Sequence, residues 1–453
     1  MTWPVVVSFT LRQAFATVDL VYARFLPERS AAVAAIALWV PFQEVYIALW
    51  VGLSAGFTAA LSHAFGRRDA TRAAALRRAA LRIQLAVACL LILAATVLWL
   101  TMGSWPIPAE LRGAFAQYGT TLMFGLPLTG LWSVWPDSIV KAHHDTKATM
   151  LAGIWATVAN VVLNTLFVFA FGWGLFGIAL ATVFSRVVAL LYALGRARRH
   201  ERRRLEERDW HHGPSLDARS PSGTILALGV PATVTFALAA SESVLVNGFL
   251  TRQPDATEAI ASYGVMNVLL KLALMPASAT AIAVVPFVSR LAAAGRIETV
   301  RRDLLQAVLL ALGFGLLFTL PAGVLFPGSV GRFFVPDSAA AALGSDLSRQ
   351  LLVLLPFGAL AVTPFLVVRP AFESVQRPRL GVLVALLRYA LLAWPLIALG
   401  ASLAPRLGIA VPLGMALGSM IAATIASSCT VALVFRELRR LAARLSDGAR
   451  SRA

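Results

Sequence analysis

Apolar segments long enough to cross a lipid bilayer recur along the whole chain. A membrane-spanning helix needs about 20 predominantly apolar residues, and a window of that length finds twelve such segments in the 453 residues. They cover residues 5–26, 34–62, 83–103, 117–140, 149–171, 174–195, 224–250, 259–289, 304–327, 348–369, 380–400 and 409–435. Only 14% of the residues are charged, against about a quarter in typical soluble domains. The pattern therefore predicts an all-α integral membrane protein with twelve transmembrane helices.

The arginines of the connections predict how these helices are oriented. The connections after the second, fourth, sixth, eighth and tenth apolar segments are basic, whereas those after the fifth and the eleventh hold at most one arginine. Basic loops stay on the cytoplasmic side of a membrane. We therefore expect a multi-pass protein of the inner or plasma membrane with both termini in the cytoplasm. The first segment lacks a basic leader and a small-residue cleavage site, so it is predicted to be a helix rather than a signal peptide.

The net charge of +18 does not indicate a nucleic-acid partner. Its arginines cluster between the apolar segments, where orientation in the membrane explains them, and no nucleic-acid motif accompanies them. No Walker loop, HExxH, GxSxG or strand-associated GxGxxG is present, so the sequence predicts neither an enzyme nor a cofactor. The pairs His143–His144 and His211–His212 are expected to be solvated loop residues. Membrane lipids are the expected contacts of the basic loops.

Two halves of the chain resemble each other. Gly66 in "AFGRRDATRAAALRR" and Gly295 in "AAAGRIETVRRDLLQ" are 229 residues apart, and Pro127 and Pro356 have the same separation. Since six helices separate equivalent positions, the halves share one orientation, which predicts two six-helix bundles related by a parallel pseudo-two-fold repeat, as in secondary transporters. The predicted parts are an N-terminal bundle (1–195), a basic cytoplasmic linker (196–222), a C-terminal bundle (223–436) and a basic cytoplasmic tail (437–453).

Ionisable side chains inside the apolar segments are the candidates for function. A charge near the bilayer centre costs roughly 2.5–3.5 kcal/mol on insertion scales, so such residues face the bundle interior or a water-filled cavity. The ionisable residues within the segments are Arg12, Asp19, Glu44, Arg186, Glu242, Lys271 and Arg388.

One subset of polar residues predicts a cation site. Asn160 and Asn164 are four residues apart and share one helix face, and Asp19 and Thr182 would add a carboxylate and a hydroxyl. Oxygen ligands of this kind bind hard cations such as sodium, and the carboxylate alone could carry a proton. A displacement of 229 residues leads from Asp19 to Gly248 and from Asn160 to Tyr389, so this site is predicted for the first half only.

Three stretches resemble the multidrug and toxic compound extrusion (MATE) transporters, within the multidrug/oligosaccharidyl-lipid/polysaccharide flippase superfamily. They are the segment from Pro4 to Asp19, "NVVLNTLFVFAFGWGLFGIALATVFSR" and "YGVMNVLLKLALMPASATAIAVVPFVSRLAAAGR". The resemblance implies a monomeric antiporter that exports organic, often cationic compounds by alternating access, in exchange for protons or sodium ions. It also implies that Asp19, Asn160, Asn164 and Thr182 form the coupling-ion site, where Asn164 replaces an aspartate common in the family.

Other functions are weighed against this exporter. A flippase for lipid-linked saccharides or cell-wall precursors belongs to the same superfamily, and several such relatives have arginine-lined cavities. That alternative gains support if Arg12, Arg186, Lys271 and Arg388 all face the cavity, and loses it if they pair with Glu44, Glu242 and Asp19. A receptor or scaffold would need a soluble output domain, which the sequence does not offer.

Overall fold

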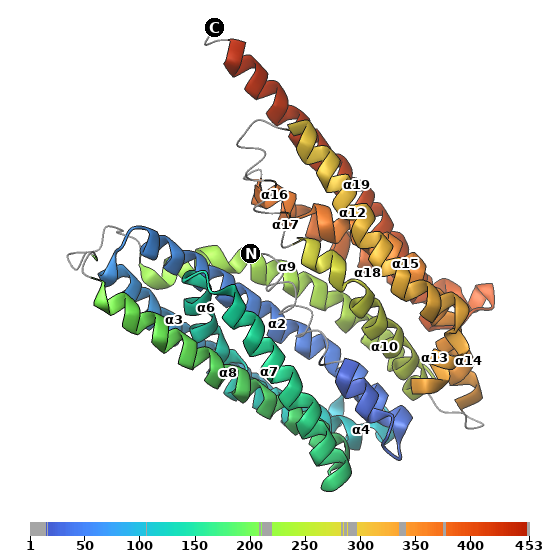
Figure 1. Ribbon diagram of the computed structural model, residues 1–453. Coiled ribbons are helices and arrows are strands. Elements are labelled where there is room, and N and C mark those ends of the chain that lie inside the picture. The colour runs from blue at the N-terminus through green and yellow to red at the C-terminus, as the bar shows by residue number, and fades with distance from the viewer. Residues whose placement is uncertain are drawn as a thin grey trace. The chain divides into compact units, whose positions relative to one another are not determined.

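Every element of the described chain is a helix. The structure is a computed structural model (Figure 1), which describes residues 15, 17–105, 107–207, 210, 220–281, 284, 288, 297–334, 341–374 and 377–450. The predicted residue Arg12 lies outside this range.

Two compact units divide the chain. The first unit ends at Ala240 and the second begins at Ser241, so α9 contributes to both. After the helical residues 17–23, the first unit contains α2 (Arg29–Gly66), α3 (Ala70–Thr101), α4 (Ala109–Phe115), η2 (Ala116–Thr120), α5 (Thr121–Leu128), α6 (Val134–Ala142), α7 (Thr146–Thr165), η4 (Leu166–Ala170), α8 (Gly174–Glu206) and the start of α9 (Pro221–Leu250). The second unit continues with α10 (Ala256–Ala273), α12 (Ile297–Leu320), η5 (Pro321–Leu325), α13 (Pro327–Phe334), α14 (Ala341–Val353), α15 (Leu355–Val368), α16 (Ala371–Ser374), α17 (Pro378–Leu386), η6 (Leu387–Leu392), α18 (Ala393–Leu403) and α19 (Val411–Arg450).

The helices have the length and the surface of membrane spans. Among the described residues, eight helices are long and apolar enough to cross a bilayer, or up to ten if each of two bent pairs forms one span. Large apolar side chains face outward along them, as Leu90, Leu93 and Leu100 do on α3. Such a surface is unfavourable in water and favourable in lipid, since lipid tails are as apolar as leucine.

Prolines explain where predicted spans bend. The span predicted at 259–289 bends by 44° after Leu274, and the span predicted at 348–369 bends by 41° at Leu354. Pro276 and Pro356 each follow two residues later, and a proline within a helix removes a backbone hydrogen bond and clashes with the preceding turn. The span predicted at 117–140 is likewise interrupted, because α5 ends after Pro127 and the chain turns at Thr129 and Gly130 before α6 begins.

Glycines allow helices to approach closely inside each unit. In the first unit, a Cβ atom on Gly52 or Gly56 of α2 would collide with backbone or side-chain atoms of α9. In the second, a Cβ atom on Gly414 or Gly418 of α19 would collide with the α18 backbone. Both pairs have the G-x-x-x-G spacing that favours close packing of membrane helices.

An ion-pair network holds the arginine-rich end of the first unit. Glu201, on the part of α8 beyond the predicted helix end at 195, forms ion pairs with Arg77 of α3 and with Arg204. Its neighbour His143 lies 3.5 Å from the Glu201 carboxylate and stacks on His200. The expectation that this histidine is a solvated loop residue is therefore wrong for His143, because α8 continues far enough to cover it.

Asp145 links the same end of α8 to the start of α7. Its carboxylate caps α7 by accepting the Ala148 N–H at 3.1 Å, and it contacts Arg196 at 2.6 Å and His200 at 2.9 Å. Burial raises the pKa of Asp145, but the hydrogen bonds with Arg196, His200 and the Ala148 N–H outweigh burial and hold that pKa below its usual value. The carboxylate is therefore ionised near neutral pH and stabilises both helix ends.

Candidate functional site

Asp19 is a buried carboxylate with hydroxyl donors on two sides. Its side chain is only 2% exposed. The Tyr118 hydroxyl donates to Oδ2 at 2.7 Å, and the Thr182 hydroxyl lies 3.2 Å from Oδ1 and 3.1 Å from Oδ2. Since Tyr118 belongs to η2 and Thr182 to α8, three segments distant in sequence meet at this carboxylate.

The two predicted asparagines complete the cluster. Asn160 donates from Nδ2 to the Thr182 hydroxyl at 3.2 Å, and Asn164 also lies near the Asp19 carboxylate. Both asparagines of α7 are fully buried, and α7 packs against α8. The structure thus brings all four predicted residues, Asp19, Asn160, Asn164 and Thr182, into one cluster (hereafter the Asp19 cluster).

Three amide atoms in the Asp19 cluster have no hydrogen-bond partner within the described chain. They are Oδ1 of Asn160 and both Oδ1 and Nδ2 of Asn164. A buried polar atom without a partner costs about 1–3 kcal/mol, and such atoms in a native fold call for an explanation. Two of the three are carbonyl oxygens in the same cluster as a carboxylate, and a bound cation would satisfy oxygen atoms of this kind.

A cation–aromatic pair borders the Asp19 cluster. The guanidinium of Arg186 lies over the Phe15 ring, 4.1 Å from its centroid, and interacts electrostatically with Asp19. Phe15 precedes Asp19 by four residues, and Arg186 follows Thr182 by four. Because residues four apart share a helix face, the pair lies about one helical turn from the carboxylate along both helices.

The tight turn before α8 aligns it with α7. Gly172 and Gly174 have φ values of +68° and +53°, a left-handed conformation that only glycine adopts without strain. The chain therefore reverses within the short segment "GWG" between η4 and α8, so that Thr182 returns to the level of Asn160.

The remaining predicted residues do not join the Asp19 cluster. Glu44 is half-buried in α2. In the second unit, Glu242 of α9 accepts a hydrogen bond from the Ser419 hydroxyl of α19, and Lys271 is half-buried in α10. Arg388, in η6, is only 7% exposed and packs against aromatic rings.

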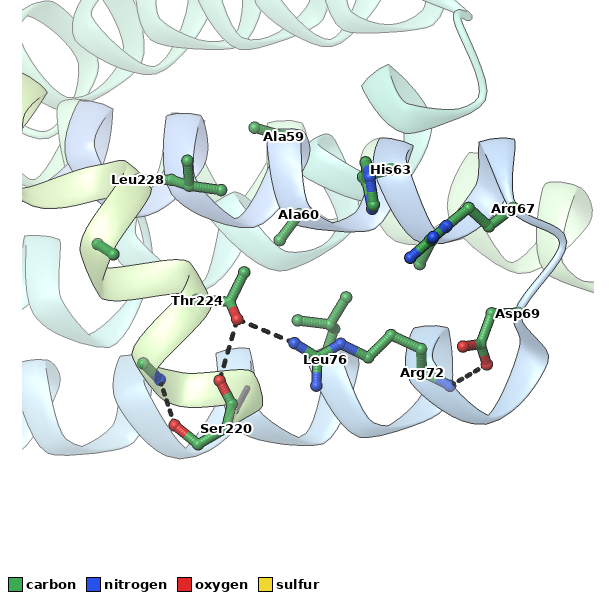
Figure 2. Close-up of a pocket in the computed structure, with 13 residues that line it drawn as sticks. Ala59, Ala60, His63, Arg67, Asp69, Arg72, Leu76, Ser220, Thr224 and Leu228 are labelled. Atoms are coloured by element: carbon green, nitrogen blue, oxygen red, sulfur yellow. Dashed lines mark hydrogen bonds between the residues drawn. The ribbon is translucent and has the colours of Figure 1, made fainter. Parts of the chain in front are cut away.

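A separate pocket of about 610 Å³ lies near the arginine-rich end of the first unit. It is lined by residues of α2, α3 and α9, and none of the predicted site residues is among them. Figure 2 shows that the Arg72 side chain reaches Thr224 at 2.9 Å, while the Arg72 backbone N–H donates to Asp69 at 2.7 Å. These contacts join the turn between α2 and α3 to the start of α9.

Sequence reasoning missed Tyr118 and Phe15. Neither side chain is charged, so neither belongs to the ionisable and small polar residues from which the site was predicted. Tyr118 is fully buried within a π-helical turn of an apolar segment, and a buried tyrosine hydroxyl usually finds a hydrogen-bond partner. That expectation is the signal that could have identified it.

For transition metals, no group of three or more His, Cys, Asp and Glu side chains is suitably placed in the part of the chain that the structure describes.

Apolar helices around a cluster of buried polar groups define the class of protein as an integral membrane protein with the fold of secondary transporters. The MatE family model matches the chain twice, over residues 4–166 and 231–399. The chain therefore belongs to the MATE family, and the two matches confirm the internal repeat predicted from the spacing of glycines and prolines.

A curated relative that the chain matches is the probable multidrug resistance protein YoeA of Bacillus subtilis (strain 168). It is 23% identical over 279 residues, which are 60% of this chain and 59% of the relative. The chain thus aligns with less than two thirds of that relative's length.

Solved structures of transporters share the fold. An inward-facing multidrug resistance MATE family transporter of the MOP superfamily matches with a TM-score of 0.77 and 18% identity, covering 97% of this chain and 98% of its own. A MOP superfamily transporter from Pyrococcus furiosus matches with a TM-score of 0.74 and 19% identity over 97% and 95%, and its description states that reverse polarity of its binding pocket suggests a different function. The bent form of the Vibrio cholerae MATE transporter VcmN matches at 0.66 and 21%, over 97% and 96%. These matches show that the chain has the transporter fold, and with the family membership they indicate a transporter rather than an enzyme.

Proposed function

We propose that this protein is a secondary antiporter that exports organic cationic or amphipathic compounds in exchange for protons or sodium ions by alternating access. Its family membership supports export of small molecules. The observation that carries the coupling to an ion is the Asp19 cluster, with a buried carboxylate and two buried amide oxygens that have no hydrogen-bond partner within the described chain.

The cluster offers ligands for either coupling ion. A sodium ion would use the carboxylate of Asp19, the hydroxyl of Thr182 and the amide oxygens of Asn160 and Asn164, because hard cations prefer oxygen ligands. A proton would need the carboxylate alone. In both cases the ion neutralises Asp19, and the hydrogen bonds that Tyr118 and Thr182 donate to it weaken.

Arg186 affects this choice. Its guanidinium interacts electrostatically with Asp19 and repels a second cation at the same place, whereas transfer of a proton to the carboxylate produces a neutral acid. An ion that enters the cluster from outside the cell would therefore neutralise Asp19. Its release to the cytoplasm would restore the negative charge of Asp19. Substrate export is proposed to use the difference between these two states.

Proteoliposomes with imposed gradients test the coupling. We expect the wild-type protein to accumulate a cationic dye inside the vesicles when either an outward proton gradient (acidic lumen) or an outward sodium gradient is imposed, because the exchanged ion must leave as the dye enters, and the effective gradient identifies the ion. The Asp19→Asn variant should not respond to either gradient. Equal gradient-driven uptake by that variant would refute the assignment of the coupling site.

Position in the membrane belongs to the same proposal. The arginine-rich connections support a protein of the cell inner or plasma membrane with both termini on the cytoplasmic side, and the proposed division into 1–195, 196–222, 223–436 and 437–453 rests on the same charges and on the apolar segments. The proposed working form is a monomer in contact with membrane lipids. Accessibility labelling of cysteines introduced at Arg67 and Arg406, on opposite predicted sides, would test the orientation.

A further inference from the structure

Arg388 lies deep within a membrane-spanning helix of the second unit. The span runs from Arg379 to Leu407, and Arg388 follows its start by nine residues, or roughly 13 Å of helix. The side chain is 7% exposed. It belongs to η6, a π-helical turn, and such turns within helices are frequent at functional sites.

Two aromatic rings of the described chain lie against this guanidinium. Its central carbon lies 4.5 Å from the centroid of the Phe365 ring and 4.6 Å from that of the Tyr389 ring. The rings are perpendicular to each other, at 89°. Within the described chain, no carboxylate forms an ion pair with Arg388, and its Nη1 is buried without a hydrogen-bond partner.

Two ring contacts do not replace a counter-charge. A cation–π contact stabilises a charge by about 0.5–2 kcal/mol, whereas a buried charge without a partner destabilises a protein by several kcal/mol. The rings cover the guanidinium and accept none of its N–H groups as a carboxylate would. They hold the fork in place and leave its donors for another group.

We propose that Arg388 binds an anionic group, a carboxylate or a phosphate, of a compound that the protein transports. An arginine fork matches both anions through paired charge-assisted hydrogen bonds. The compound would then carry an anionic group in addition to the cationic or amphipathic body expected of a MATE substrate. That the anion belongs to a transported compound rests on the proposed function, whereas the chemistry of the site does not.

The internal repeat supports a distinct role for this position. Tyr389 is the repeat equivalent of Asn160, so Arg388 lies beside the position that contributes an amide to the Asp19 cluster in the first unit. The second unit therefore presents a positive charge at the place where the first presents oxygen ligands for a cation.

Equilibrium binding to the purified full chain tests the site without any gradient. Rhodamine B carries a cationic ring system and a carboxylate, and its ethyl ester lacks only the negative charge. Fluorescence polarisation would compare both dyes on wild type, Arg388→Gln, Arg388→Lys and the exposed control Arg406→Gln. We expect Arg388→Gln to weaken rhodamine B binding by about 10-fold or more, the ratio expected when one charged hydrogen bond is lost. Binding of the ester should be unchanged, and Arg388→Lys should be intermediate.

A second arm identifies the source of the anion. The same measurements in micelles containing phosphatidylglycerol or phosphatidylcholine, with native mass spectrometry of bound lipid, show whether a lipid phosphate occupies Arg388. Phosphatidylglycerol retained by wild type and lost in Arg388→Gln would support the anion site and refute a transported compound as its source. Equal affinities of wild type and Arg388→Gln for rhodamine B and for phosphatidylglycerol would overturn the site.

Thermal unfolding tests whether Arg388 has a purely structural role. Because Arg388 forms no ion pair with any described residue, Arg388→Gln should melt no lower than wild type, and a markedly lower melting temperature would reveal a protein partner and overturn the proposal. Loss of gradient-driven transport with dye discrimination retained would refute the proposed function and leave this site intact.

Discussion

The two units surround their buried charges in opposite ways. In the first unit, Asp19 receives hydrogen bonds from Tyr118 and Thr182 and has amide oxygens close by. In the second, Arg388 packs against the rings of Phe365 and Tyr389 and forms no ion pair within the described chain. An oxygen-rich pocket around a carboxylate suits a small cation, whereas a guanidinium held between rings suits a planar anion. The difference underlies both proposals: the coupling ion is assigned to the first half of the duplicated scaffold, and an anionic substrate group to the second.

The largest effect is expected from removing the charge of the first unit. Asp19→Asn should reduce ion-driven dye uptake in proteoliposomes by about 100-fold or more, because the loss of a group that binds the coupled ion removes the driving force and not merely one contact. Asp346→Asn is the matched control, since Asp346 is exposed and its carboxylate contacts Gln350 of the same helix. Similar losses in both variants would show that the effect is not specific to the Asp19 cluster.

A smaller effect is expected from replacing Asn164, whose amide atoms have no hydrogen-bond partner in the described chain. Asn164→Leu should reduce ion-driven uptake by about 10-fold, the equivalent of roughly 1.4 kcal/mol, because it removes one oxygen ligand. Its melting temperature should stay equal to that of wild type or rise, since neither amide atom of Asn164 has a partner in the described chain.

The neighbouring asparagine provides the comparison. Asn160→Leu should lower the melting temperature, because Asn160 donates a hydrogen bond to Thr182. If Asn164→Leu were the less stable variant, Asn164 would be a structural residue. The first unit would then no longer offer the Asn164 oxygen as a free ligand for a cation.

The second unit is tested through the ring beneath its charge. Phe365→Leu removes one cation–π contact with Arg388, and we expect rhodamine B to bind about 3- to 5-fold more weakly, within the 0.5–1 kcal/mol that such a contact contributes. The ethyl ester should bind as before. Phe357→Leu on the same helix is the control because Phe357 is 59% exposed. An equal loss for both dyes would indicate general damage to packing.

The smallest effect is expected at the arginine-rich end of the first unit, which does not contribute to the contrast between Asp19 and Arg388. Asp145→Asn keeps an N-cap residue on α7 but removes the ion pairs with Arg196 and His200, so we expect a loss of about 1 kcal/mol of stability at pH 7. Because the folded-state pKa of Asp145 lies below its ordinary value, this contribution is complete above about pH 4 and disappears as the pH falls through the folded-state pKa. Thermal unfolding from pH 7 to pH 3 should show wild type and variant converging, and uptake at pH 7 should be equal.

Most of the helices and the members of the Asp19 cluster could be predicted from the sequence, but their neighbours could not. Apolar length and the charges of the loops determine which segments span a membrane, and the spacing of Asn160 and Asn164 places both on one face of α7. Contacts between helices depend on how each helix rotates about its axis, which spacing within a helix does not reveal. For that reason Tyr118 and Phe15 remained unidentified, and Arg388 was recognised as a charge without its aromatic surroundings. Whether Arg12 faces a cavity or pairs with an acidic residue stays a prediction, since Arg12 lies outside the described residues.

Gradient-driven uptake of the rhodamine B ethyl ester by wild type, Asp19→Asn and Arg388→Gln in parallel tests most directly whether the two units divide their work. This dye is a cation without the anionic group proposed to bind Arg388. The account predicts that Arg388→Gln transports the ester at the wild-type rate while Asp19→Asn does not concentrate it. Retained uptake in Asp19→Asn, or loss of ester uptake in Arg388→Gln, would contradict the division.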